Sequence, residues 1–322
     1  MKKYITIIVF LALSIFGCKN KTDSSELTEV TFATSKNMWC GLGLIAYEKE
    51  YFKEYGLDVD IKFLDAGRYC LDALVSESAE FATIVEVNTA YFGYTGNTSI
   101  INIASIVSST SSGIIANMSN GIEKPEDLAG KILALSPGTT SDIFANRFIE
   151  KYKLSRKNIE LRQIQPIAMH GAVVSGGVDA ASTWDPHIYN INKSLSGNGI
   201  VFRDPEIYTG YMLVATRKEW ASKNKSTVTS FIKALKKAEQ FAISNVNEAK
   251  MIVSNIINLD FEIVSATWED HVMTLKLDEK ELLEAIKSEG TWFNQNLEEY
   301  KNQEVPDYEP YIVDDYLMEA LN

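Results

Sequence analysis

The sequence contains an internal repeat that constrains the fold more than any other feature. Residues 73–86 and 172–185 align without a gap, and each stretch reads as a helix end, a turn, a strand of small and apolar residues and a final acid. The strands upstream correspond in the same way, 59–63 with 159–163 and 30–35 with 131–136. Helical segments separate the strands of each copy, which indicates parallel strands joined by right-handed crossovers. The repeat predicts one α/β unit used twice; chance similarity between two generic βαβ patterns is the alternative.

Two segments are expected to be the first helices of the two copies, 42–55 and 140–152. Between the copies, the Ser-rich stretch 108–113 lies where an expected strand, 100–109, gives way to another, 111–118. We interpret this stretch as a crossover from one unit to the other. It predicts two lobes rather than one continuous sheet.

The chain turns helical after the strand 208–216, and those helices need a lobe to pack on. They are expected at 227–245, 246–257, 261–271 and 278–296. We therefore predict that lobe one comprises residues 27–112 plus 210–322, and that lobe two comprises residues 113–209. Two connections between lobes form a hinge. The expected architecture is α/β, with parallel-type sheets flanked by helices and a ligand cleft between the lobes.

The N-terminus predicts export. Residues 1–17 combine a basic start, an apolar run and a small residue before Cys18, as secretory signals do. The run is too short to span a bilayer comfortably. Residues 15–18 resemble a bacterial lipobox, which predicts a lipid on Cys18 and a tether over 18–26; a plain signal peptide with a chance cysteine is the alternative. The expected location is the periplasmic or cell-surface side of a membrane.

Composition argues against several function classes. The net charge is −12 and the pI about 4.9, whereas nucleic-acid binders usually carry a basic surface. The three histidines show no metal-site spacing, and no Gly-x-Ser-x-Gly elbow occurs. We predict no enzyme activity, no metal and no cofactor, although Glu86 and Asp185 could in principle form an acid/base pair.

Ligands bind beyond the carboxyl ends of parallel strands, so the loops there hold the candidate binding residues. Glu86 and Asp185 occupy equivalent positions in the two copies and could grip an amine, or they could be solvated loop acids. Arg68 could hold a carboxylate or sulfonate. The start of the 140–152 helix, at Thr139, Thr140 and Ser141, could bind an anion or simply cap the helix.

Aromatic and sulfur side chains follow the same strands. Trp39, Trp184 and, less strongly, Tyr69 could sandwich a flat or apolar ligand, or belong to the core. Cys40 and Cys70 follow adjacent strands. An exported compartment permits a disulfide between them, and otherwise they are expected as two thiols lining the cleft.

Several motifs together resemble a known family. They are KPEDLAGK at 124–131, PGT at 137–139, GVDA at 177–180, WDPH at 184–187, the segment 47–59 and VATRKEW at 214–220. The set is similar to the periplasmic-type substrate-binding proteins of ABC importers, in the branch that binds nitrate, sulfonates, taurine and thiamine-precursor pyrimidines. The resemblance covers most of residues 28–260. It implies the type II periplasmic-binding-protein fold, a monomer that closes on a small solute, and a membrane permease as partner.

By position, the resemblance implies ligand contacts on the loops described above. They are Asn37, Trp39, Arg68, Glu86, Thr139, Thr140, Trp184 and Asp185. The acids and aromatics suit an aminopyrimidine, the anion-binding features suit a sulfonate, and taurine carries both kinds of group; nitrate ranks lower. A secreted enzyme or a sensor lobe using the same cleft is the alternative function.

Overall fold

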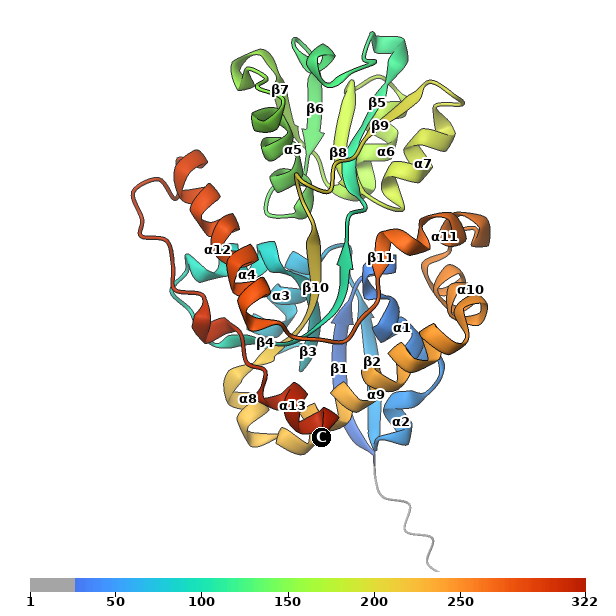
Figure 1. Cartoon of the computed structure of the whole chain (residues 1–322), viewed down its shortest axis with the longest axis vertical. Helices are drawn as coiled ribbons and strands as arrows, with labels where there is room; N and C mark the ends of the chain where they lie inside the picture. The colour runs from blue at the N-terminus through green and yellow to red at the C-terminus, as the bar shows by residue number, and fades with distance from the viewer. Residues whose placement is uncertain (1–26) are drawn as a thin grey trace, which may run out of the picture.

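The computed structural model describes residues 27–322, which build two β-sheets placed one above the other (Figure 1). The predicted signal segment, Cys18 and the tether lie outside the described residues. The first sheet has the order β11-β4-β10-β3-β1-β2, and the second has the order β7-β6-β8-β5-β9. We call each sheet with its flanking helices a lobe, lobe one for the six-stranded sheet and lobe two for the five-stranded sheet.

The strands of lobe one are β1 (Thr28–Thr34), β2 (Leu57–Phe63), β3 (Phe81–Val85), β4 (Ile100–Ser109), β10 (Gly210–Arg217) and β11 (His271–Val272). Those of lobe two are β5 (Ser112–Asn117), β6 (Ile132–Leu135), β7 (Glu160–Gln163), β8 (Ala180–Trp184) and β9 (Gly199–Phe202). The chain passes between the sheets twice, from β4 to β5 and from β9 to β10.

The repeat found in the sequence is present in the structure. β1 pairs in parallel with β2 and β3, and β6 pairs in parallel with β7 and β8. The three strands of the repeat therefore have the same order at one edge of each sheet, with β2 and β7 outermost. The crossover helices are α1 (Gly41–Glu48) and α3 (Gly67–Val75) in lobe one, and α5 (Thr140–Lys151) and α6 (Pro166–Val174) in lobe two. The first expected helix is interrupted, because Glu50 adopts a left-handed conformation before α2 (Tyr51–Glu54).

The expectation of parallel-type sheets is wrong for strands that enter from the other lobe. β10 runs antiparallel to β3 and β4, and β5 runs antiparallel to β8 and β9. The reason is geometric. β3 and β8 end where the two lobes meet, whereas β10 and β5 begin there, after the chain has crossed from the other lobe. The registers Gly210↔Ser109 and Ser112↔Trp184 place these strand ends side by side.

The helices of the C-terminal third pack mainly around the six-stranded sheet. Its helices are α8 (Lys218–Lys223), α9 (Lys225–Ser244), α10 (Val246–Ile257), α11 (Phe261–Thr267), α12 (Glu279–Asn296) and α13 (Asp315–Leu321). α9 packs against α1, and α12 lies along α4 (Glu86–Gly93) and reaches toward lobe two (Figure 1). Phe231 of α9 stacks on Phe81 of β3, with the ring centroids 3.9 Å apart.

The expected helix over 261–271 is shorter than predicted. α11 ends at Thr267, and His271 instead pairs with Ser109 as part of β11. Between residues 27 and 322 we find no helix with both the length and the apolar character needed to cross a membrane.

Candidate functional site

A narrow cavity with an empty volume of about 370 Å³ lies between the two lobes. It is lined by Asn37, Trp39, Ala66, Gly67, Arg68, Val85, Asn88, Thr139, Thr140, Trp184 and Met212. Most of these residues follow the carboxyl ends of strands in both lobes, as expected for parallel strands. The structure thus brings together six of the eight predicted residues: Asn37, Trp39, Arg68, Thr139, Thr140 and Trp184.

Two helices begin at this cavity, one from each lobe. α3 starts at Gly67 after Ala66, which offers no side-chain cap, and α5 starts at Thr140 after its cap Thr139. The Thr139 hydroxyl accepts a hydrogen bond from Ser141 N (3.2 Å) and donates one to Ser136 O (2.7 Å). The first N–H groups of a helix lack intrahelical partners and carry partial positive charge. The cavity therefore lies at two positive helix ends.

The charged groups around the cavity add to the positive potential of the two helix ends. Arg68 is the only charged residue among the lining residues named above. Asp142, in the first turn of α5, lines a neighbouring groove instead. Its carboxylate accepts hydrogen bonds from Tyr91 Oη (2.9 Å) and Asn146 Nδ2 (2.7 Å), and burial raises its pKa. The cavity therefore favours a negatively charged ligand.

Two tryptophans, Trp39 and Trp184, supply apolar surface beside the helix N-termini and Arg68. Trp39 is 2% exposed and donates from Nε1 to Ser111 Oγ (2.8 Å). A Cβ at Gly210 would come within 2.5 Å of the Trp39 ring, so only glycine fits against it. Trp184 stands edge-on to His187. Tyr69 is not among the lining residues, and it donates instead to Gln165 Oε1 across the lobes (2.9 Å).

Asn37 and Asn88 bring amide groups to the cavity. Asn37 Oδ1 is buried and has no hydrogen-bond partner within the described residues. Asn88 accepts from Val85 N and donates from Nδ2 to Gly138 O, both at 3.1 Å. Asn88 is a lining residue that sequence reasoning left out of the predicted set, although it lies on the loop that was recognised from the repeat.

Glu86 lies outside the lining residues. Its carboxylate is fully buried at the start of α4, where it accepts hydrogen bonds from Tyr208 Oη and Tyr211 N. Burial raises its pKa to about 7 despite these bonds. Glu86 thus anchors the segment that returns to lobe one. Tyr208 and Tyr211 belong to a part of the chain that the repeat does not cover, so no local pattern predicts this pairing.

Asp185 also lies outside the lining residues. It is 1% exposed, forms an ion pair with Arg203, and accepts from Tyr189 N (3.3 Å). Arg203 in turn donates to Ser111 O (2.9 Å), so Asp185 and Arg203 connect the second crossing of the chain to the first. Both predicted acids therefore bind protein groups beside the crossings rather than facing the cavity.

The two cysteines lie in the core of lobe one. Both are free and fully buried, so they form no disulfide, and neither lines the cavity. Cys40 Sγ lies 3.4 Å from Thr83 Oγ1, and burial raises the pKa of both thiols. The expectation of cleft-lining thiols is wrong because Cys40, just before α1, and Cys70, in α3, both turn their side chains into the core. Among residues 27–322, no group of three or more His, Cys, Asp or Glu could hold a metal ion.

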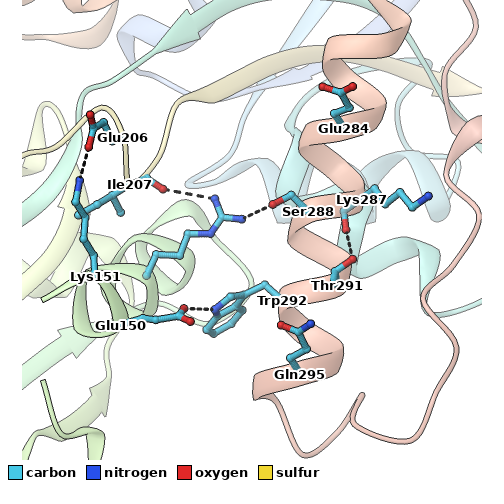
Figure 2. A pocket seen from close by; sticks show the side chains of 11 residues that line it. Glu150, Lys151, Glu206, Ile207, Glu284, Lys287, Ser288, Thr291, Trp292 and Gln295 are labelled. Atoms are coloured by element: carbon cyan, nitrogen blue, oxygen red, sulfur yellow. Dashed lines mark hydrogen bonds and ion pairs between the residues drawn. The ribbon is translucent and has the colours of Figure 1, made fainter. Parts of the chain in front are cut away.

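The lobes touch directly along a seam between α5 and α12, beside an open groove (Figure 2). Arg147 of α5 pairs with Glu289 of α12 (3.0 Å) and donates to Ser288 Oγ (3.2 Å). Trp292 Nε1 donates to Glu150 Oε2 (3.3 Å). These contacts join the lobes at a place distant in sequence from both crossings.

Two buried carboxyls near Arg147 make stability depend on pH. Glu289 and Glu86 are both close to Arg147, and burial raises their pKa values to about 8 and about 7. Between about pH 4.5 and those values the folded protein holds protons that the unfolded chain has released. The stability that these groups contribute is therefore present below about pH 4.5 and is lost as pH rises through 7 and 8.

We expect Glu289→Gln to remove part of this dependence, because glutamine does not ionise. Between pH 5 and 8 the unfolding free energy of the variant should rise relative to the natural chain by up to about 1.4 kcal/mol per pH unit. Denaturant unfolding at several pH values measures this difference. Glu284→Gln, at an exposed position of the same helix, is the control. Parallel curves for Glu289→Gln and the natural chain would contradict the assignment.

Solved structures share this architecture. The periplasmic aliphatic sulphonate binding protein SsuA from Escherichia coli superposes with a TM-score of 0.74 at 17% identity, covering 89% of this chain and 92% of that chain. The two lobes with mixed sheets and flanking helices define the periplasmic-binding-protein fold.

A family model described as NMT1/THI5 like matches residues 42–249, and the chain belongs to that family. Among similar curated proteins, the taurine-binding periplasmic protein of Escherichia coli is 24% identical over 205 residues, 62% of each chain. The formylaminopyrimidine-binding protein of Halalkalibacterium halodurans is 21% identical over 286 residues, 85% of this chain and 86% of that protein.

Proposed function

We propose that this protein is the extracytoplasmic solute-binding component of an ABC importer and that its solute is a small organic sulfonate. The observation that carries the proposal is the cavity itself. Two helix N-termini and Arg68 supply positive charge there, and no acid is among the lining residues of the described chain. Helix N-termini bind anions readily, and a guanidinium binds sulfonate oxygens well.

The rest of the cavity favours an organic solute over a bare inorganic anion. Trp39, Trp184, Met212, Val85 and Ala66 offer apolar surface to a carbon skeleton. Nitrate has no carbon skeleton to bury against this surface. Glu86 and Asp185, the two acids expected to hold an aminopyrimidine, already bind tyrosine and arginine side chains. Asn37 Oδ1 remains as an acceptor, which suits the ammonium group of taurine.

We propose that Asn37, Trp39, Arg68, Thr139, Thr140 and Trp184 contact the solute. Capture would proceed by closure of the predicted lobes, residues 27–112 plus 210–322 and residues 113–209, about the two crossings. Hydrogen bonds across the cavity wall support this, because Arg68 Nη1 donates to Pro137 O at 3.1 Å and Asn88 to Gly138 O. Such bonds exist only when the lobes meet.

The proposal extends to the cellular setting. Processing at the N-terminal signal and a lipid on Cys18 would hold the protein on the outer side of a membrane, as a monomer that delivers solute to a membrane permease. Relatives that are named for solute binding support this role. A binding role is favoured over a secreted enzyme or a sensor lobe because the cavity lining, as far as the chain is described, offers neither acid, histidine nor cysteine.

Thermal unfolding of the purified protein against a solute panel tests the proposal. The panel contains taurine, ethanesulfonate, nitrate and formylaminopyrimidine, and the protein is first unfolded and refolded to release any co-purified solute. A sulfonate at a hundred times its Kd should stabilise the fold by about 2.7 kcal/mol, which raises Tm by several degrees. A shift with formylaminopyrimidine alone would overturn the solute class, and a flat panel would overturn the binding function.

A further inference from the structure

A second, larger groove adjoins the cavity at one wall. It has an empty volume of about 1810 Å³ and opens to solvent between the lobes. Arg68 and Asn88 line both spaces. The cavity and the groove are therefore neighbours that share a wall.

That wall consists of two hydrogen bonds between side chains of lobe one and the backbone of lobe two. Arg68 donates to Pro137 O and Asn88 donates to Gly138 O. Arg68 is exposed, and its guanidinium forms no ion pair with any acid of the described chain. Its Cζ lies 5.6 Å from the centroid of the Tyr69 ring. The guanidinium can exchange its one neutral acceptor, Pro137 O, for a sulfonate oxygen, which opens the wall on that side. Asn88 is fixed more firmly, because Val85 N also donates to it.

The groove beyond the wall has a chemistry different from that of the cavity. Its walls carry apolar surface from Leu71, Tyr91, Leu135, Leu161 and Tyr300. Four acids and two arginines also line it, namely Asp72, Asp142, Glu298, Glu299, Arg68 and Arg156. The groove thus suits an uncharged or cationic group and disfavours an anionic one, whereas the cavity favours an anion.

We propose that the groove is a subsite for the organic tail of the solute, which leaves the cavity between Arg68 and Asn88 while its sulfonate stays with the two helix ends and the Arg68 guanidinium. This inference rests on the proposed function and adds the chemistry of the rest of the solute. Tails that are apolar or end in an amine gain contacts in the groove. Tails that end in a second anion meet the acids at its rim.

Titration calorimetry with three probes tests the subsite on the purified protein. The probes are ethanesulfonate, hexanesulfonate and 1,6-hexanedisulfonate. A fully buried methylene contributes about fourfold in affinity, so partial burial of four more should make hexanesulfonate bind at least tenfold tighter than ethanesulfonate. The disulfonate should lose at least tenfold relative to hexanesulfonate, because its second anion faces the acidic rim.

Two variants locate the effect in the groove. Leu161→Trp fills its β7 side, and Gln163→Trp does so from an exposed position that tolerates substitution. Each should bring the hexanesulfonate-to-ethanesulfonate affinity ratio close to one. Val174→Trp is the control, since Val174 is exposed in the same lobe and lines neither space.

The outcomes separate this inference from the proposed function. If ethanesulfonate and hexanesulfonate both fail to bind, the sulfonate function fails and the subsite with it. If ethanesulfonate binds but hexanesulfonate binds no tighter, the function stands and the subsite is overturned. A ratio that stays high in both groove variants would also overturn it.

Discussion

Replacing Thr140 with aspartate weakens sulfonate binding by at least a hundredfold. Thr140 is the first residue of α5 and lines the cavity, so the new carboxylate faces the bound anion. Two like charges about 4 Å apart repel by about 4 kcal/mol at an effective dielectric constant near 20. The fold should tolerate the change because an acid is favourable in the first turn of a helix. Titration calorimetry with ethanesulfonate measures the loss.

Thr140→Ser is the matched control, since it keeps the hydroxyl and adds no charge. Its affinity should stay within a few fold of that of the natural chain. A formylaminopyrimidine that binds Thr140→Asp better than the natural chain would show that the cavity accepts amines when an acid is supplied. Undiminished sulfonate binding by Thr140→Asp would place the anion elsewhere.

Replacing Arg203 with methionine lowers the free energy of unfolding by about 3 kcal/mol. The change leaves the carboxylate of Asp185, which is 1% exposed, without its ion-pair partner. Removing one member of a buried pair typically costs about 3–5 kcal/mol because a buried charge is left uncompensated. The loss also removes the bond from Arg203 to Ser111 O that connects the two crossings. Denaturant unfolding measures the effect.

The double variant Arg203→Met with Asp185→Leu is the control for this prediction. It removes both charges, so it should recover a large part of the lost stability. Lys193→Met, at an exposed pair with Asp260, should change stability by less than about 1 kcal/mol. Equal stabilities of the single Arg203 variant and the natural chain would contradict the role given to the pair.

The strand and helix order shared by the two sheets could be predicted from the sequence, because the same local patterns occur twice in the repeat. Strands such as β1 and β6, and the crossover helix α5, follow from hydrophobic periodicity and turn residues. The antiparallel entry of β5 and β10 could not be derived in this way. It depends on where the chain crosses between sheets, which is a property of the tertiary arrangement rather than of any local pattern.

The candidate site, too, could be predicted only in part from the sequence. Trp39, Arg68 and Thr140 line the cavity, and their position could be predicted because the ends of parallel strands gather at one edge. Glu86 and Asp185 lie on the same loops, yet their side chains bind Tyr208 and Arg203. Those partners come from the segment before β10, outside the repeat, and a sequence pattern shows which residues follow a strand but not which partner each side chain finds.

The most direct test of the central claim is a calorimetric titration of ethanesulfonate into the purified protein, with the ligand recovered afterwards. One ethanesulfonate should bind saturably per chain at the cavity between the lobes, Thr140→Asp should bind it far more weakly, and the ethanesulfonate recovered afterwards should be unchanged. The absence of binding heat at any concentration up to the millimolar range, or conversion of the sulfonate to a product, would contradict it.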